Sequence, residues 1–178
     1  MNQINEIRRL YTLGPQGTNC EFAAKKFLHH NQVCADIILM PTLEAGAAEV
    51  LSHEDSILMG CIAYPNLHNL MFSNLRNLKL VEVFVTDTLT MVMASRSSGN
   101  PQLVYCHPAT ESLIAEPLRS IPTATSNASA AMFDGAPSEA GSCITTLRSS
   151  QAMKLTQLRS FGSIEMGFSI HMRRTNDV

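Results

Sequence analysis

Apolar residues along the first half of the chain fall alternately into short continuous runs and into helical spacings. Apolar runs at 10–13, 37–40 and 57–63 predict strands, and the 37–40 run predicts a strand buried on both faces. Between them, helical spacing predicts helices from Thr18 to about 30 and over 43–51. Strands that alternate with helices predict α/β layers and a mostly parallel sheet.

The second half repeats this alternation. The predicted elements are strands at 81–85, 88–94 and 102–106, a helix from Pro108, a strand near 121, a helix from about 126, a strand at 142–145, a helix at 145–153 and strands at 154–159 and 164–172. We expect a crossing near residue 90 and a return near 155. The chain then forms one domain of two lobes, 1–90 with 155–178 and 91–154, with a ligand cleft between them.

The stretch from 12 to 24 carries the most specific local signal. Gly14 and Gly17 permit a tight turn and a close approach of the backbone to a ligand. Thr18 and Glu21 have the spacing of a capping box, which places a helix start at this point. The N–H groups of Thr18, Asn19 and Cys20 then form a candidate seat for a carboxylate or phosphate, although a plain helix cap has the same sequence.

Composition excludes several classes of function. The 178 residues are 45% hydrophobic, which suffices for a packed core, and 13 basic side chains against 15 acidic ones indicate no nucleic-acid partner. No apolar run is long enough for a signal core or a membrane span, so we expect a cytoplasmic protein without a membrane partner. Five dispersed cysteines and six histidines show no metal-binding spacing, and we expect no metal.

Three motifs resemble those of the prephenate dehydratase family. The stretch G-P-Q-G-T-N-C-E-F-A-A at 14–24 resembles the family's G-P-x-G-T-x-S-x-x-A-A, V-Y-C-H-P-A-T-E-S-L at 104–113 resembles its Ser-His-Pro helix entry, and T-S-N-A-S-A-A at 125–131 resembles its Ser-Thr-x-x-Ala-Ala start. The resemblance implies a two-lobed α/β fold like that of type II periplasmic binding proteins. It further implies a cleft that holds prephenate without a cofactor, and a homodimer.

The chain departs from this family near its end. Where the dehydratases carry a Thr-Arg-Phe signature, an alignment on Phe168 puts Met166 and Gly167 in place of the threonine and arginine. Neither can donate a proton or pair with a carboxylate. We also expect no regulatory ACT domain. Without an acid to help the ring hydroxyl leave, loss of carbon dioxide can end in protonation of a ring carbon. This is the reaction of the prephenate decarboxylases of bacilysin-type antibiotic pathways. The stretches at 61–72 and 79–88 also resemble that subgroup.

The candidate site residues follow from the motifs and from this resemblance. The catalytic candidates are Tyr64 and His68, as proton donors to the ring or its water; packing at a lobe edge is the alternative. The substrate-binding candidates, several of which have helix capping as their alternative, are Thr18, Asn19, Cys20, His107, Thr110, Ser126, Asn127, Ala128 and Met166. The rival functions are an ordinary prephenate dehydratase and a prephenate-binding module without catalysis.

Overall fold

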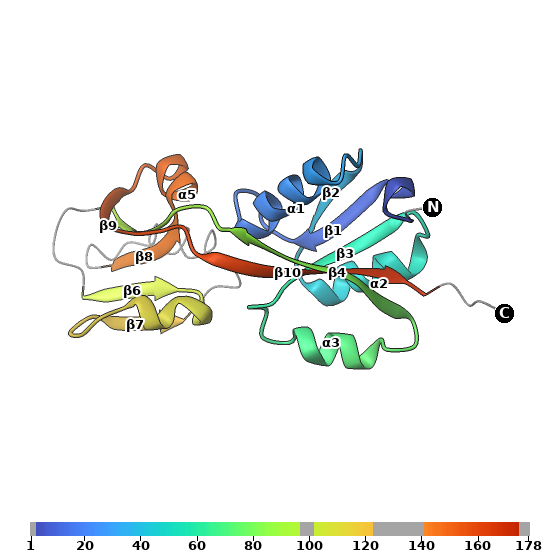
Figure 1. Cartoon of the computed structure of the whole chain (residues 1–178). Helices are drawn as coiled ribbons and strands as arrows, with labels where there is room; N and C mark the ends of the chain where they lie inside the picture. The colour runs from blue at the N-terminus through green and yellow to red at the C-terminus, as the bar shows by residue number, and fades with distance from the viewer. Residues whose placement is uncertain (1–2, 97–101, 123–140, 175–178) are drawn as a thin grey trace. The chain divides into compact units, whose positions relative to one another are not determined.

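The computed structural model describes residues 3–96, 102–122 and 141–174. They form two compact units. Among the described residues, unit 1 comprises 3–14, 20–86 and 165–174, and unit 2 comprises 15–19, 87–96, 102–122 and 141–164. The structure therefore has two units, each with a sheet of its own (Figure 1).

Unit 1 is a five-stranded sheet with helices on both faces. Its elements are β1 (Arg9–Leu13), α1 (Asn19–His30), β2 (Asp36–Met40), α2 (Leu43–Ser52), β3 (Ser56–Cys61), α3 (Leu67–Ser73), β4 (Leu78–Asp87) and β10 (Glu165–Arg173). The strand order is β2-β1-β3-β10-β4, with β1 parallel to β2 and β3, and β10 antiparallel to β3.

The alternation of side chains along β10 divides the core of unit 1 into two layers. On one face, Phe168 stacks on Phe84 at a centroid distance of 5.6 Å, and Phe84 stacks on Phe27 of α1 at 5.4 Å. On the other face, Ser169 lies beside Gly60, where a Cβ would meet Leu67 of α3 at 2.9 Å. Helices α1 and α3 therefore cover opposite faces of the sheet.

Unit 2 is a smaller five-stranded sheet. Its elements are β5 (Met91–Ser95), β6 (Leu103–Cys106), a 3₁₀ helix (Pro108–Leu113), β7 (Arg119–Pro122), β8 (Gly141–Thr146), α5 (Leu147–Ala152) and β9 (Thr156–Gly162). The strand order is β7-β6-β8-β5-β9, in which β6 is parallel to β7 and β8 while β5 is antiparallel to β8 and β9. Met91, Val104, Cys106 and Ile144 form its buried apolar cluster.

Several sequence predictions need correction. Strand β2 lies at a sheet edge and is only partly buried, because it has a neighbour on one side alone. The expected return near 155 is wrong, since β9 pairs with β5 along its length and the chain re-enters unit 1 only at Glu165. The helix at Pro108 is a 3₁₀ helix, and the segment after β3 contains the unpredicted helix α3. Strand β10 pairs antiparallel with β3 in unit 1, and β5 pairs antiparallel with β8 and β9 in unit 2, which the predicted mostly parallel sheet did not anticipate.

The helix predicted from about 126 lies outside the described residues. Within the described ranges, no helix has the length and apolar character needed to cross a membrane.

Candidate functional site

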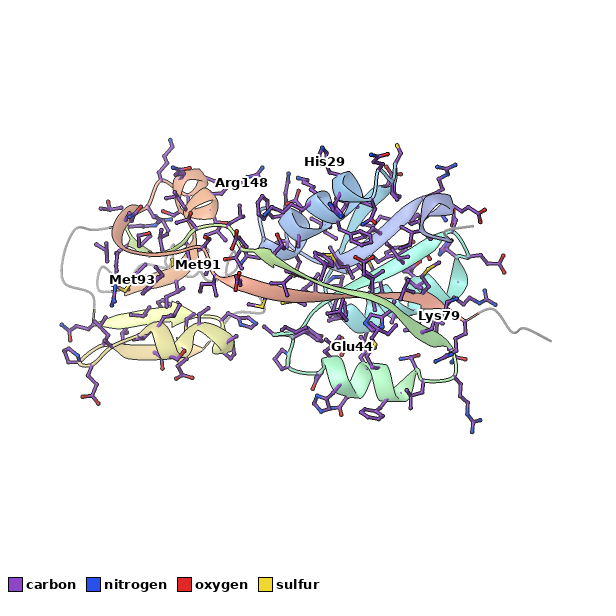
Figure 2. All side chains as sticks on the ribbon, viewed as in Figure 1. His29, Glu44, Lys79, Met91, Met93 and Arg148 are labelled. Atoms are coloured by element: carbon purple, nitrogen blue, oxygen red, sulfur yellow. The ribbon has the colours of Figure 1, made fainter. Side chains whose placement is uncertain are left out.

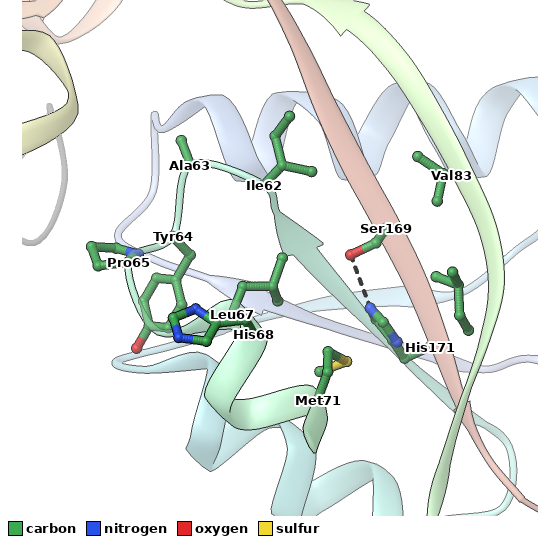
Figure 3. A pocket seen from close by; sticks show the side chains of 11 residues that line it. Ile62, Ala63, Tyr64, Pro65, Leu67, His68, Met71, Val83, Ser169 and His171 are labelled. Carbon is green, nitrogen blue, oxygen red and sulfur yellow. Dashed lines mark hydrogen bonds between the residues drawn. The ribbon is translucent and has the colours of Figure 1, made fainter. Parts of the chain in front are cut away.

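A cavity of about 510 Å³ opens on the α3 face of the unit 1 sheet (Figure 3). It lies where β3 ends, so that the turn after the strand and the first turn of α3 form one wall while β4 and β10 form the other. The lining residues are Ile62, Ala63, Tyr64, Pro65, Leu67, His68, Met71, Leu80, Val83, Ser169 and His171. A mostly apolar cavity with a few polar groups is typical of a small-molecule site.

The two catalytic candidates both line this cavity. The Tyr64 hydroxyl donates a hydrogen bond to Glu44 Oε2 at 2.7 Å. Burial, with Glu44 beside it, raises the pKa of Tyr64 to about 12, so the phenol keeps its proton at neutral pH. His68 lies on α3 with an exposed side chain. The structure thus brings the predicted pair to one cavity, where Tyr64 is anchored and His68 is open to solvent.

Two further polar residues of the cavity, Ser169 and His171, were missed by the sequence analysis. They alternate with Phe168, Ile170 and Met172 along β10, and strand alternation places both on the cavity side. His171 is only 4% exposed, and its Nε2 lies 2.9 Å from Ser169 Oγ. Burial lowers the pKa of His171 to about 4, so the ring is neutral at pH 7. The signal in the sequence was two polar residues at alternate positions of an apolar strand.

The helix start at 18–20 uses its side chains within the protein. The Asn19 side chain accepts a hydrogen bond from Leu89 N at 3.0 Å and donates one to Met91 Sδ at 3.7 Å. Thr18 is buried. A hydrogen bond to Cys61 and burial raise the pKa of the Cys20 thiol well above its usual range, so Cys20 is an interior thiol. Gly17 has a φ of +85°, which explains why glycine stands in this turn.

His107 and Thr110 stabilise the short 3₁₀ helix of unit 2. His107 Nδ1 accepts a hydrogen bond from Ala109 N at 3.1 Å, and Thr110 Oγ1 donates to His107 O at 2.9 Å. Burial lowers the pKa of His107, which keeps the ring available as an acceptor. Both side chains thus make the capping contacts that the sequence offered as the alternative to substrate binding. The candidates Ser126, Asn127 and Ala128 lie outside the described residues.

The positions aligned with the dehydratase signature lie at the start of β10. Met166 packs against the apolar core of unit 1. Ile62 N donates a hydrogen bond to Gly167 O at 3.1 Å, and a Cβ at Gly167 would come within 2.7 Å of Ile62 Cδ1. Any side chain at residue 167 would require Ile62 to move, so a glycine at this position fits the present position of the Ile62 side chain.

Metal ligands do not gather in the described part of the chain: no three His, Cys, Asp or Glu side chains there could hold one ion.

Comparisons with known proteins show the fold. No family model matches the chain, and no curated protein matches its sequence. A prephenate dehydratase from Arthrobacter aurescens, solved with L-Phe, is 16% identical with a TM-score of 0.71, over 94% of this chain and 61% of that chain. GqqA, described as a novel type of quorum-quenching acylase, is 14% identical with a TM-score of 0.64, over 96% and 66%.

A periplasmic substrate-binding protein of an ABC transporter from Coxiella burnetii is 13% identical with a TM-score of 0.54, over 94% of this chain and 84% of that chain. The chain thus spans less than two thirds of the dehydratase and acylase structures. Three proteins with different described functions share this architecture, which confirms the two-lobed α/β fold of the type II binding-protein kind and leaves the chemistry to the site residues.

Proposed function

We propose that this protein is a lyase that decarboxylates prephenate without making the ring aromatic. The observation that carries the proposal is that Met166 and Gly167 occupy the positions aligned with the dehydratase threonine and arginine; Gly167 has no side chain, and a Cβ there would lie 2.7 Å from Ile62 Cδ1. Met166, at the threonine position, offers no proton. The three sequence motifs and the fold shared with a prephenate dehydratase support prephenate as the substrate.

The proposed reaction breaks the bond between the ring and its carboxylate, and carbon dioxide leaves. In a dehydratase the released electron pair expels the ring hydroxyl, which an acid must protonate to leave as water. Without that acid, the pair is taken up by a proton at a ring carbon and the hydroxyl is retained. The product is a dihydro-4-hydroxyphenylpyruvate, and the step needs no oxidant and no cofactor.

We assign proton delivery to His68, with Tyr64 as the second candidate. Tyr64 holds its proton tightly, with a pKa of about 12, and its hydroxyl already donates to Glu44. A hydrogen-bonding role therefore suits Tyr64 better than proton transfer. The backbone N–H groups of Thr18, Asn19 and Cys20 are the proposed seat of a carboxylate, with His107, Thr110, Ser126, Asn127, Ala128 and Met166 as the further substrate-binding candidates.

Two other functions are outcomes of the same test. A prephenate dehydratase with its acid at another residue would have the same fold as its relative from Arthrobacter aurescens. A prephenate-binding module without catalysis would share the architecture of the periplasmic substrate-binding protein. We further propose that the protein is cytoplasmic and forms a homodimer; light scattering of the purified protein would test the dimer.

The deciding experiment incubates the purified protein with fresh prephenate and identifies the product by ultraviolet and mass spectra against a sample without protein. We expect a product that has lost carbon dioxide and kept its hydroxyl. Phenylpyruvate would instead establish the dehydratase. Unchanged prephenate that still binds in calorimetry would establish the binding module.

Two variants test the assignment of His68. We expect His68→Gln to lower kcat about 100-fold or more, which is the usual contribution of a positioned acid. His29→Gln is the matched control, since His29 is an exposed histidine of unit 1 that does not line the cavity. Equal activity of the two variants would remove His68 from the mechanism.

A further inference from the structure

The cavity under α3, whose wall carries Tyr64 and His68 of the proposed reaction, also holds two polar residues that the reaction does not use, Ser169 and His171. Its eleven lining residues include no lysine, arginine, aspartate or glutamate. Beside the buried His171, a carboxylate would have no cationic partner, which is unfavourable, whereas the exposed side of the cavity at His68 is open to water. The part of the cavity at His171 is therefore suited to an uncharged molecule.

The polar floor of the cavity determines which hydrogen bond such a molecule would make. Ser169 Oγ donates its single hydrogen to Gly60 O at 3.4 Å. With that hydrogen on Gly60 O, we assign the Ser169 oxygen as the acceptor of the 2.9 Å hydrogen bond from His171 Nε2; this assignment puts the proton of the neutral ring on Nε2 and leaves Nδ1 as an acceptor. The same direction of hydrogen bonding argues against Ser169 as a nucleophile, because His171 does not accept its proton.

His171 Nδ1 is the unused acceptor in this arrangement. Among the described residues, none hydrogen-bonds to it, although the His171 side chain is buried. A buried acceptor without a partner costs free energy until a ligand or a water supplies a hydrogen. In Figure 3 the His171 ring belongs to the β10 wall of the cavity, and Met71 of α3 lies on the opposite wall.

We propose that this cavity is a binding site for a small, uncharged, largely apolar molecule that donates one hydrogen bond to His171, such as a phenol, an indole or a related N–H heterocycle. Its volume of about 510 Å³ suits a ligand of one or two rings. Ile62, Leu67, Met71 and Val83 supply the apolar contacts. The ligand would share the cavity wall that carries Tyr64 and His68, and the two proposals are separated by experiment, because binding is measured in the absence of prephenate.

The test compares indole with 1-methylindole, which has the same ring system without the N–H group. Calorimetry on the whole chain should show that indole binds about five to ten times more tightly, the usual effect of one net hydrogen bond. In ¹⁵N–¹H correlation spectra, His171 Nδ1 should be unprotonated in the free protein and should shift when indole is added. Equal affinities for the two probes, or a protonated Nδ1, would overturn the assignment of the donor.

Two tryptophan substitutions locate the site. Ala63→Trp should fill the cavity from the turn after β3 and should abolish indole binding. Ala152→Trp is the control, because Ala152 is an exposed residue of α5 in unit 2. A folded His171→Phe variant should bind indole and 1-methylindole equally. If that variant does not fold, Ala63→Trp still tests the site, because it leaves the buried histidine unchanged. Indole binding that survives Ala63→Trp would show that the ligand lies elsewhere.

Discussion

The two units bury different kinds of side chain. The core of unit 1 is a continuous cluster of large apolar residues in which Leu10, Phe27, Leu58 and Phe168 are almost completely buried. In the described part of unit 2 the buried apolar cluster is small, and buried hydroxyls lie in the same sheet: Ser95, Ser142, Thr145 and Thr146. Among the described residues, unit 1 therefore has the larger apolar core, and unit 2 has buried hydroxyls beside a smaller one.

The hydroxyls of unit 2 connect neighbouring strands. Ser95 Oγ of β5 donates to Gly141 O of β8 at 2.7 Å, and Ser142 Oγ of β8 donates to Leu103 O of β6 at 3.2 Å. One such hydrogen bond contributes about 1 kcal/mol, whereas burying one large apolar side chain contributes about 1.5–3 kcal/mol. Removing a large buried apolar side chain from unit 1 should thus be more damaging than removing a buried hydroxyl from unit 2.

The largest effect is expected at Phe168. Phe168→Ala removes a ring that is 1% exposed and stacks on Phe84, and it should lower the free energy of unfolding by about 3–5 kcal/mol. Hydrogen exchange should increase in β1, β3 and β10 before it increases in β6 and β8. Val85→Ala, at a side chain that is 65% exposed, is the control and should change stability by less than about 0.5 kcal/mol. If Phe168→Ala lowers the free energy of unfolding by less than about 1 kcal/mol, the claim that large apolar side chains stabilise unit 1 is wrong.

The next effect is acid destabilisation through His171 of unit 1. The pKa of its ring is about 4 in the folded protein and 6.5 when unperturbed, so between these values the unfolded chain binds more protons. The free energy of unfolding should therefore fall as the pH is lowered from 6.5 to 4, by up to roughly 3 kcal/mol, and this contribution should be constant above 6.5.

Denaturant titrations at several pH values check this prediction. The stability difference between the wild type and His171→Asn should depend on pH within that window. The difference between the wild type and Ser73→Ala, which changes no titratable group, should not. A difference at residue 171 that is independent of pH would show that the buried ring does not resist protonation.

A smaller effect is expected from the hydroxyls of unit 2. Ser95→Ala removes the donor to Gly141 O and should destabilise the protein by about 1–2 kcal/mol. Increased hydrogen exchange should be confined to β5 and β8. Ser73→Ala, at an exposed serine of unit 1, should have no measurable effect. If Ser95→Ala and Ser73→Ala are equally stable, the hydrogen bond from Ser95 to Gly141 O does not stabilise unit 2.

The smallest effect is expected at the start of α2. Thr42 Oγ1 accepts a hydrogen bond from Ala45 N at 3.1 Å, and Thr42→Ala should cost about 1 kcal/mol. Thr42→Ser retains the oxygen and should recover most of that loss. Thermal unfolding of the three proteins side by side measures the difference, and a serine variant as unstable as the alanine variant would exclude capping as the cause.

Local pattern predicted most elements of unit 1. The runs at 10–13, 37–40 and 57–63 became β1, β2 and β3, and the helical spacings became α1 and α2. The local sequence pattern did not predict α3, because polar residues stand between the apolar positions of this helix. Such a mixture is typical of a loop as well as of a short exposed helix. Nor could the local pattern predict that β2 is an edge strand, since strand order depends on pairing between distant segments.

The candidate site was predictable only in part. Tyr64 and His68 were selected from the polar and apolar residues that follow a strand, and both line the cavity. Ser169 and His171 come from β10, about 100 residues later, and reach the same cavity because β10 pairs with β3. Asn19 and His107 were selected for ligand binding, but their side chains are occupied by Leu89 N and Ala109 N.

The sequence by itself determined the alternation of strands and helices, the glycine turn before α1 and the absence of a donor at residues 166 and 167, because each depends on residues close together in the chain. Only the tertiary structure decided that Gly167 lies against Ile62, that β9 stays in unit 2 and that His171 is buried with an unused nitrogen. These features depend on which strands pair and on what surrounds each side chain. Periodicity along the chain carries no information about either.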